Sequence, residues 1–196
     1  MRANRRYKDK SPTGFTLLEL LVTIAIVAIL LLVAIPGMGD FFITNRLVTS
    51  TNDFVAALNT ARIEAIRRRT SISLVKNSAT SGDWGSAGWT MFVDSDNDGA
   101  LDAGETVLKI GETLPSPLTL YANNNFVNFI RFKSTGEVTN AGTFVFCYGG
   151  VLQQGGSPRS RAIAVIKTGR ARVATDTDGD GIPNTDGGNV ASCTNP

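Results

Sequence analysis

The longest apolar run of the sequence lies near its start. It extends from Phe15 to Ile35, and Glu19 is the only charged residue among these 21. At 1.5 Å per residue, a helix of this length measures about 31 Å, which matches the hydrocarbon thickness of a bilayer. Residues 1–14 carry five basic side chains and one acidic side chain, so the positive-inside rule keeps them in the cytoplasm. The pattern predicts a single transmembrane helix over 15–36, with the rest of the chain on the far side of the membrane.

Glu19 places a carboxylate inside this apolar run. An unpaired carboxylate in hydrocarbon costs roughly 2–3 kcal/mol on insertion scales, so such a residue usually has a cationic partner at the same depth. The run is also longer than the roughly 7–15 apolar residues of a secretory signal peptide. A helix that stays in the protein, with a cation beside Glu19, explains the pattern better than a cleaved signal peptide or a simple anchor.

A second helical pattern follows at residues 37–69. Apolar residues such as Leu47, Phe54 and Leu58 recur with a 3.6-residue period, which predicts an amphipathic helix. Three consecutive arginines, 67–69, mark its expected end, where basic side chains favour the negative end of the helix dipole. These arginines are interpreted as a solvated helix terminus, with anion binding as the alternative.

Beyond residue 70 the pattern changes to short runs rich in β-branched and aromatic residues, separated by turn clusters. Seven such runs are expected to be strands: 71–76, 89–93, 106–110, 118–122, 127–133, 143–148 and 161–167. Their spacing and turn residues favour antiparallel pairing over parallel βαβ units. The sequence therefore predicts an α+β fold, in which a long N-terminal helix packs on an antiparallel β domain formed by residues 70–196.

The composition excludes several kinds of chemistry. The 196 residues include no histidine, so imidazole bases, imidazole metal ligands and Ser–His–Asp triads are impossible. Neither a P-loop nor a serine-elbow motif occurs. Carboxylate pairs within residues 94–105 are the remaining catalytic candidates, but their close spacing suits a cation better than glycoside hydrolysis. We therefore expect no enzymatic activity.

The two cysteines, Cys147 and Cys193, both lie beyond the predicted transmembrane helix. In an oxidising compartment, an even pair of cysteines is most simply a disulfide. Closing that loop would stabilise the fold by roughly 4 kcal/mol in the chain-entropy model, and would hold a polar C-terminal tail in place. Two unpaired buried thiols are the alternative.

An acidic segment, residues 94–105, has the ligand spacing of an EF-hand loop. Oxygen ligands stand at loop positions 1, 3, 5, 9 and 12, which are Asp94, Asp96, Asp98, Asp102 and Glu105, and Gly99 stands at position 6. Predicted strands rather than helices flank the loop, so a bound Ca²⁺ would act as a structural clip and not as a sensor. The alternative is an Asx-rich turn that binds nothing.

A second acidic run, residues 176–184, repeats the Asp-x-Asp-x-Asp-Gly start of the first. Gly187 stands where an EF-hand would have its bidentate Glu. The run resembles the calcium repeats of thrombospondin type 3. A flexible loop is the alternative.

Basic residues gather between residues 159 and 172. Thr168 and Gly169 separate two strand-like runs and can form a tight turn. Arg170 and Arg172, two residues apart on an extended strand, would project from one face about 6.6 Å apart, and guanidinium groups suit backbone phosphates. The alternative is that these arginines neutralise the nearby acidic run.

The segment Gly14-Phe15-Thr16-Leu17-Leu18-Glu19 resembles the type IV prepilin motif, which pilins share with the pseudopilins of type II secretion. This resemblance implies cleavage by a prepilin peptidase after Gly14 and N-methylation of Phe15. It also implies a bacterial inner-membrane location, with a periplasmic C-terminal domain and assembly with other pilin or pseudopilin subunits. In the family, a glutamate at the position of Glu19 pairs with the N-terminal amine of a neighbouring subunit.

The helix-plus-β layout, the first acidic loop and the late cysteine pair together resemble the GspH/FimT family of minor pilins. Gly169-Arg170-Ala171-Arg172 resembles the Gly-Arg-x-Arg motif with which FimT-type members bind DNA. The resemblance implies a minor pilin that binds double-stranded DNA during natural transformation, through Lys167, Gly169, Arg170 and Arg172. The alternative is an H-type minor pseudopilin that helps to initiate or cap a type II secretion filament without binding DNA.

Overall fold

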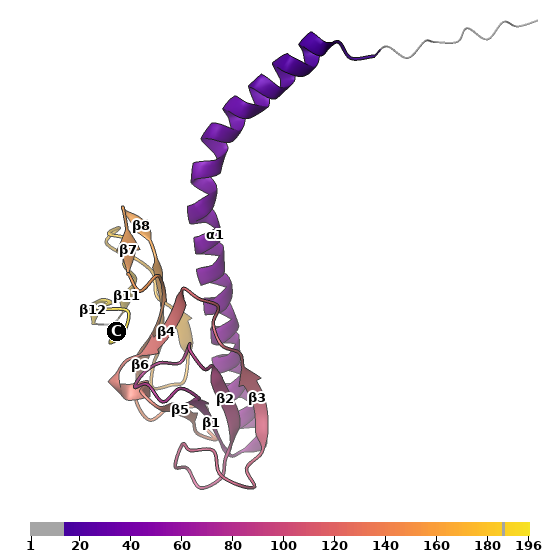
Figure 1. Ribbon diagram of the computed structural model, residues 1–196. Coiled ribbons are helices and arrows are strands. Elements are labelled where there is room, and N and C mark those ends of the chain that lie inside the picture. The colour runs from indigo at the N-terminus through magenta and orange to yellow at the C-terminus, as the bar shows by residue number, and fades with distance from the viewer. Residues whose placement is uncertain (1–13, 186) are drawn as a thin grey trace, which may run out of the picture. The chain divides into compact units, whose positions relative to one another are not determined.

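The computed structural model describes residues 14–185 and 187–196 (Figure 1). Of the predicted leader, residues 1–14, only Gly14 is among the described residues. The chain divides into two compact units, Met1–Gly39 and Asp40–Pro196.

A single helix, α1 (Leu17–Arg68), covers both predicted helices. Its first turn is capped by Thr16, whose Oγ1 accepts a hydrogen bond from the backbone N–H of Glu19 at 3.2 Å. Its last turn closes through Arg69, which has a left-handed backbone with φ at 56°. The N–H of Thr70 then donates to the carbonyl of Ala65 at 3.3 Å. The basic run at 67–69 thus ends the helix as predicted.

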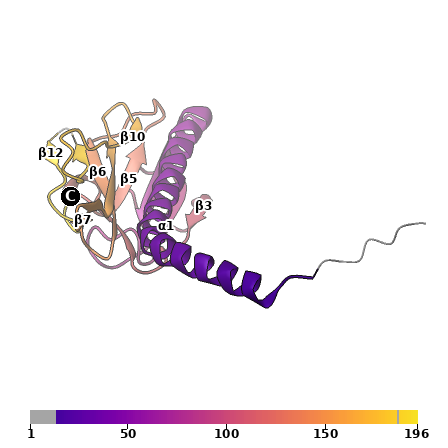
Figure 2. The same cartoon turned by 90° about the horizontal axis from the view of Figure 1, so that it is seen from above.

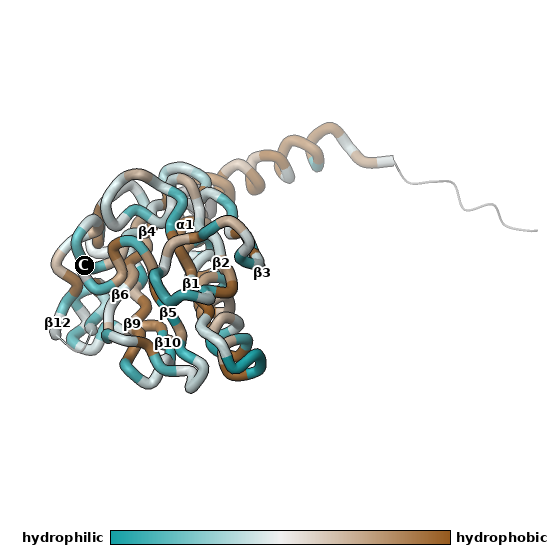
Figure 3. Tube along the Cα trace, turned by 90° about the horizontal axis from the view of Figure 1, so that it is seen from below, coloured by the Kyte–Doolittle hydropathy of each residue, from teal (hydrophilic) through white to brown (hydrophobic). Residues whose placement is uncertain are grey.

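In the first unit, the large apolar side chains of α1 between residues 17 and 32 are exposed. Leu17, Leu18 and Leu32 are 81%, 74% and 76% exposed, and this part of the helix is brown, hence hydrophobic, in Figure 3. Among the described residues, no helix meets the length and apolarity that a membrane crossing requires. The transmembrane helix predicted over 15–36 is therefore not confirmed.

The second unit contains two four-stranded antiparallel sheets. The first has the order β3-β2-β1-β5, with β1 (Ser71–Lys76), β2 (Trp89–Asp94), β3 (Val107–Gly111) and β5 (Phe129–Phe132). The second has the order β10-β9-β6-β4, with β4 (Leu118–Ala122), β6 (Gly142–Tyr148), β9 (Ser160–Val165) and β10 (Ala171–Val173). All seven predicted strands are present, with ends that differ by at most two residues. The antiparallel α+β fold is thereby confirmed.

The sequence pattern missed the shortest elements. These are the two-residue strands β7 (Gln153–Gln154), β8 (Ser157–Pro158), β11 (Asn184–Thr185) and β12 (Gly188–Asn189), and the 3-10 turn η1 (Asn124–Phe126). Polar or glycine-containing pairs of residues carry no alternation of apolar and polar positions, so no periodicity marks them.

The main core lies between α1 and the two sheets (Figure 2). Leu47, Phe54, Leu58 and other apolar residues of α1 are buried against strands of both sheets. Phe54 is the centre of an aromatic cluster, because four rings lie edge-on to it at centroid distances of 4.9 to 6.1 Å: Trp84, Trp89, Phe144 and Phe146. The predicted apolar stripe of α1 therefore forms the helix side of the core.

A smaller core lies between the second sheet and the C-terminal segment. Val145 and Ala162 of the sheet pack there with Ala174, Val190 and Cys193. Ala174, Val190 and Cys193 belong to a C-terminal segment that is polar overall. Burial of these few apolar side chains holds the segment on the sheet.

The β7–β8 hairpin is connected to α1 by an ion pair. Arg159 Nη2 donates to Asp40 Oδ1 at 2.7 Å, and Ser157 Oγ donates to Asp40 Oδ2 at 3.0 Å. The hydrogen bonds from Ser157 and Arg159 lower the pKa of Asp40 below its ordinary value. The side chain of Arg159 is largely buried, whereas that of Asp40 is exposed. The ion pair holds the β7–β8 hairpin beside α1 at Asp40.

Candidate functional site

The basic segment forms a hairpin between β9 and β10. Ala171 pairs with Val165, and Arg172 pairs with Ala164. The connecting turn closes through the N–H of Gly169, which donates to the carbonyl of Ile166 at 2.8 Å. Lys167 and Arg170 are exposed in this turn, whereas Arg172 is partly buried on β10. The predicted turn at residues 168 and 169 is thus confirmed.

Gly169 is required by its backbone and by its surroundings. Its φ is +77°, and a Cβ atom placed on it would lie 1.9 Å from the carbonyl oxygen of Gly136. A side chain at this position would therefore be strained and would clash with backbone. The glycine of the Gly-Arg-x-Arg motif lets the hairpin pack against the turn formed by residues 133–137.

The turn at 133–137 also joins α1 to the hairpin. Arg62 of α1 donates through Nε to the carbonyl of Gly136 at 3.0 Å, and the N–H of Val138 donates to the carbonyl of Lys167 at 3.0 Å. Lys133, at the start of this turn, is exposed, as are Lys167 and Arg170. Three distant segments therefore meet at this turn: Arg62 contacts it through its side chain, and the segments of Lys133 and Lys167 contact it through backbone hydrogen bonds. We call Arg62, Lys133, Lys167 and Arg170 the Gly136 basic cluster.

Sequence reasoning missed Arg62 and Lys133. Arg62 lies 74 residues from Gly136 along the chain, and nothing in its local sequence distinguishes it from other arginines of the helix. The sequence does contain one signal, which is Gly136, a glycine between two predicted strands and therefore a candidate turn residue. In the structure its φ is +80°, as a tight turn requires.

The arginines at the end of α1 have a different role. Arg67 Nη2 and Arg68 Nε each lie 2.6 Å from Glu64 Oε2. Hydrogen bonds from Arg67 and Arg68 lower the pKa of Glu64 to about 2. Both guanidinium groups are engaged within the helix end, which supports the interpretation of this run as a solvated terminus.

The acidic run near the hairpin does not pair with Arg170. Within the described part of the chain, no ion pair joins Arg170 to Asp176, Asp178 or Asp180. Asp176 instead accepts hydrogen bonds from the backbone N–H groups of Gly181 and Gly179, at 2.8 and 2.7 Å, and these lower its pKa below the ordinary value. Asp180 likewise accepts from the backbone N–H of Ile182 and from Asn189, so neither Asp176 nor Asp180 depends on Arg170 for a partner.

The first acidic loop connects β2 to β3. Of its five predicted ligands, Asp94, Asp96 and Asp98 converge, with one carboxylate oxygen of each within 4.8 Å of the others. Glu105 closes the loop by accepting from the backbone N–H of Ser95 at 2.7 Å and of Asp102 at 3.1 Å. The negative charge of Asp98 is the largest cause of a raised pKa at Asp102.

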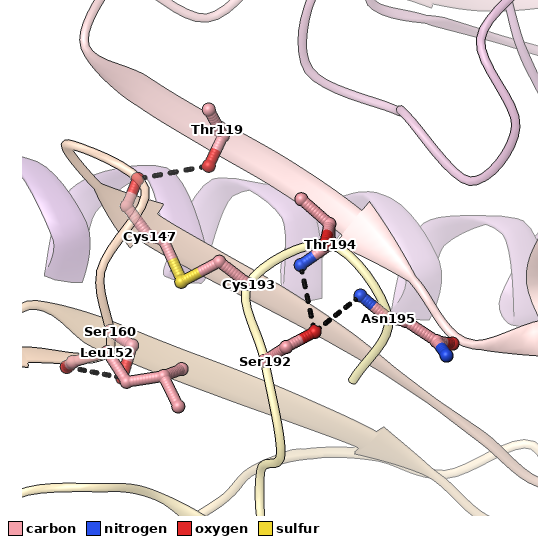
Figure 4. Close-up of a disulfide and its surroundings, with 8 residues drawn as sticks. All are labelled: Thr119, Cys147, Leu152, Ser160, Ser192, Cys193, Thr194 and Asn195. Atoms are coloured by element: carbon pink, nitrogen blue, oxygen red, sulfur yellow. Dashed lines mark hydrogen bonds between the residues drawn. A yellow bond between two sulfur atoms is a disulfide. The ribbon is translucent and has the colours of Figure 1, made fainter.

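A disulfide joins Cys147 of β6 to Cys193 of the tail (Figure 4). The two Cα atoms are 5.9 Å apart. Both residues are buried in the smaller core, and Ser192 Oγ beside the bond accepts from the backbone N–H of Asn195 at 2.8 Å. The predicted pairing of the only two cysteines is confirmed.

The residues of the prepilin motif lie at the start of α1. Gly14 and Phe15 precede the helix, and Phe15 is 85% exposed. Glu19 occupies the third position after the Thr16 cap and its side chain is exposed. Both the motif and the apolar surface that follows it are thus available to other molecules.

Comparisons with known proteins agree on the kind of molecule. Residues 50–169 match the family model described as Type II transport protein GspH, and residues 10–35 match the prokaryotic N-terminal methylation motif. No curated protein matches the chain. Two crystal forms of the type IV minor pilin FimU from Pseudomonas aeruginosa are similar at 21% identity, with TM-scores of 0.55 and 0.53. They cover 78% and 75% of this chain and 98% and 99% of FimU.

A third solved structure is the minor pseudopilin EpsH from the type 2 secretion system of Vibrio cholerae. It has 15% identity and a TM-score of 0.45, and covers 68% of this chain and 99% of EpsH.

An N-terminal methylation motif at the start of a long helix that packs on antiparallel sheets defines the fold of type IV pilins. Because the family model matches more than half of the chain, the chain belongs to the GspH family of minor pilins and pseudopilins. Membership implies processing by a prepilin peptidase and assembly with other pilin subunits. Proteins of this family are structural and not enzymes.

Proposed function

We propose that this chain is a minor type IV pilin that binds double-stranded DNA during uptake, through the β9–β10 hairpin. The observation that carries the proposal is the Gly136 basic cluster, in which Arg62 and Lys133 join Lys167 and Arg170 of the hairpin around one turn. Exposed guanidinium and ammonium groups bind backbone phosphates without reading the base sequence. Arg172, the second arginine of the motif, lies on the adjoining strand β10 and is partly exposed.

Replacement of both motif arginines, Arg170→Gln with Arg172→Gln, is expected to weaken DNA binding at least about tenfold. Each lost phosphate contact should also reduce the slope of log affinity against log salt by about 1. The measurement is fluorescence anisotropy of a labelled duplex of random sequence, titrated with the full chain in detergent micelles at several salt concentrations.

Arg67→Gln with Arg68→Gln is the matched control, because it removes the same charge from side chains that are engaged by Glu64. It should change the affinity much less. Lys167→Gln with Arg170→Gln tests the same surface with two exposed residues, whose replacement leaves the core intact. Unchanged affinity in both hairpin variants would exclude this site.

A second candidate function is favoured by the family description, which names a type II transport protein. In this case the chain is an H-type minor pseudopilin that helps to initiate or cap a secretion filament. Absence of DNA binding by the unmodified chain, together with its copurification with other minor pseudopilins, would support this function over DNA uptake.

The proposal includes a location in the bacterial inner membrane, with residues 1–14 cytoplasmic and residues 40–196 periplasmic. This location is supported by the methylation motif at residues 10–35 and by the exposed apolar side chains at the start of α1. Glu19 is proposed to pair with the methylated N-terminal amine of Phe15 in a neighbouring subunit, because a carboxylate in apolar surroundings requires a cation.

Glu19→Gln keeps the size of the side chain but removes its charge, so it should prevent assembly without preventing membrane insertion. We expect the variant to be digested by protease added to spheroplasts, as the unmodified chain is, but to be lost from complexes with other pilin subunits. Copurification from solubilised membranes measures the second effect. Glu112→Gln, an exposed residue of the second unit, is the control. Normal assembly of the Glu19 variant would refute the ion pair, and protection from protease would refute the topology.

A further inference from the structure

We propose that the β2–β3 loop is a calcium site and that the ion completes the environment of one buried carboxylate, Asp94. This inference is independent of DNA binding. The convergence of Asp94, Asp96 and Asp98 would not be sufficient by itself, because exposed acidic groups often gather without an ion. The decisive observation is that Asp94 is buried and that one of its carboxylate oxygens has no hydrogen-bond partner among the described residues.

Asp94 is completely buried at the end of β2. Its Oδ2 accepts a hydrogen bond from Ser73 Oγ at 2.6 Å, whereas its Oδ1 is buried without a hydrogen-bond partner among the described residues. A buried carboxylate oxygen that lacks a partner is costly, because it has lost its hydration without compensation. A cation at the point where the three carboxylates meet would supply the missing interaction.

Protein cations compensate this charge only in part. Arg131 Nη1 lies 3.8 Å from Asp94 Oδ2, beyond hydrogen-bond distance, and its guanidinium lies over the ring of Phe129 at 5.4 Å. This one guanidinium faces a loop that carries five carboxylates. The loop therefore retains an excess of negative charge around a buried oxygen.

The loop is also held in a shape suited to an ion. Gly99 has a φ of +81°, and a Cβ atom on it would lie 2.6 Å from the ring of Phe129, so this glycine packs directly on β5. Glu105, the last residue of the loop, accepts from the N–H groups of Ser95 and Asp102 and so links the two ends of the loop. These contacts at the middle and the ends of the loop hold Asp94, Asp96 and Asp98 close together despite their mutual repulsion.

The donor set favours calcium. Three carboxylates on an irregular loop offer several oxygen ligands without strict octahedral geometry, which suits Ca²⁺ with its 6–8 flexible ligands better than Mg²⁺. Backbone carbonyls and water would fill the remaining positions. Aspartates of both acidic loops accept backbone hydrogen bonds within their own loop, but all three aspartates of the second loop are exposed, whereas Asp94 of the first is buried with one oxygen unpaired. The site is therefore assigned to the β2–β3 loop alone.

The test is calorimetric titration of the full chain in detergent micelles with CaCl₂, together with thermal unfolding. We expect one ion per chain and a rise in Tm of about 5–10 °C at a calcium concentration 100 times the Kd. Asp96→Asn with Asp98→Asn should abolish both effects, and these residues are exposed, so the variant keeps its core. Asp178→Asn with Asp180→Asn, the matched change in the second loop, should leave both effects intact.

Several results would overturn the assignment. The first is the absence of saturable heat and of any Tm shift up to millimolar CaCl₂ in the unmodified chain. The second is normal calcium binding by the Asp96/Asp98 variant, or loss of binding in the Asp178/Asp180 variant. An equal Tm shift with MgCl₂ would refute the choice of calcium.

Discussion

Phe54→Ala is expected to lower the free energy of unfolding by about 3–5 kcal/mol, because it removes the central ring of the main core. Phe54 is 3% exposed and contacts four aromatic rings contributed by β2, β6 and the β1–β2 connection. These rings are held by strands of two different sheets, so they cannot close fully around the cavity. Urea unfolding of residues 40–196, which contain all residues of both cores, measures the loss.

Ile63→Ala is the control for Phe54→Ala. Ile63 lies on the same helix but is 61% exposed, so its replacement should change the stability by less than about 1 kcal/mol. Similar losses in the two variants would show that α1 does not pack on the sheets through Phe54.

Loss of the disulfide, through Cys147→Ser with Cys193→Ser, is expected to lower the free energy of unfolding by about 4 kcal/mol. The two cysteines are 46 residues apart, so the bond closes a long loop and restricts the unfolded chain considerably. The bond also holds the tail over the smaller core, where Val190 and Ala174 would otherwise gain solvent. Urea unfolding of residues 40–196 measures this effect as well.

Reduction of the unmodified domain with dithiothreitol is the control, since it breaks the same bond without changing the sequence. It should lower the urea midpoint to about that of the double-serine variant. An unchanged midpoint in the reduced protein would show that the bond adds nothing to stability.

Much of the local structure could be predicted from the sequence. The 3.6-residue period that includes Leu47, Phe54 and Leu58 located the buried face of α1, and alternating β-branched runs located seven strands, because burial imposes both periodicities. The only two cysteines left a single possible intramolecular disulfide. The turn at Gly169 also followed from local chemistry, since only glycine readily adopts the backbone that it requires.

The candidate sites depended more on tertiary contacts. The sequence placed five ligands in the first acidic loop, but the structure gives Glu105 a bracing role and leaves one oxygen of Asp94 buried and unpaired. The two acidic loops begin with the same Asp-x-Asp-x-Asp-Gly pattern, but they differ in burial because Asp94 ends a central strand while Asp176 lies in an exposed tail.

The sequence alone thus determined the longer elements, the disulfide and the class of protein, because each rests on residues that are neighbours in the chain or are unique in it. Only the tertiary structure decided which basic residues meet around Gly136. Arg62, Gly136 and Gly169 lie far apart in sequence, and their contact depends on how strands from two sheets pair and pack on α1. The pairing of these strands is stabilised by burial of the whole core, so it cannot be predicted from the local sequence around any one of these residues.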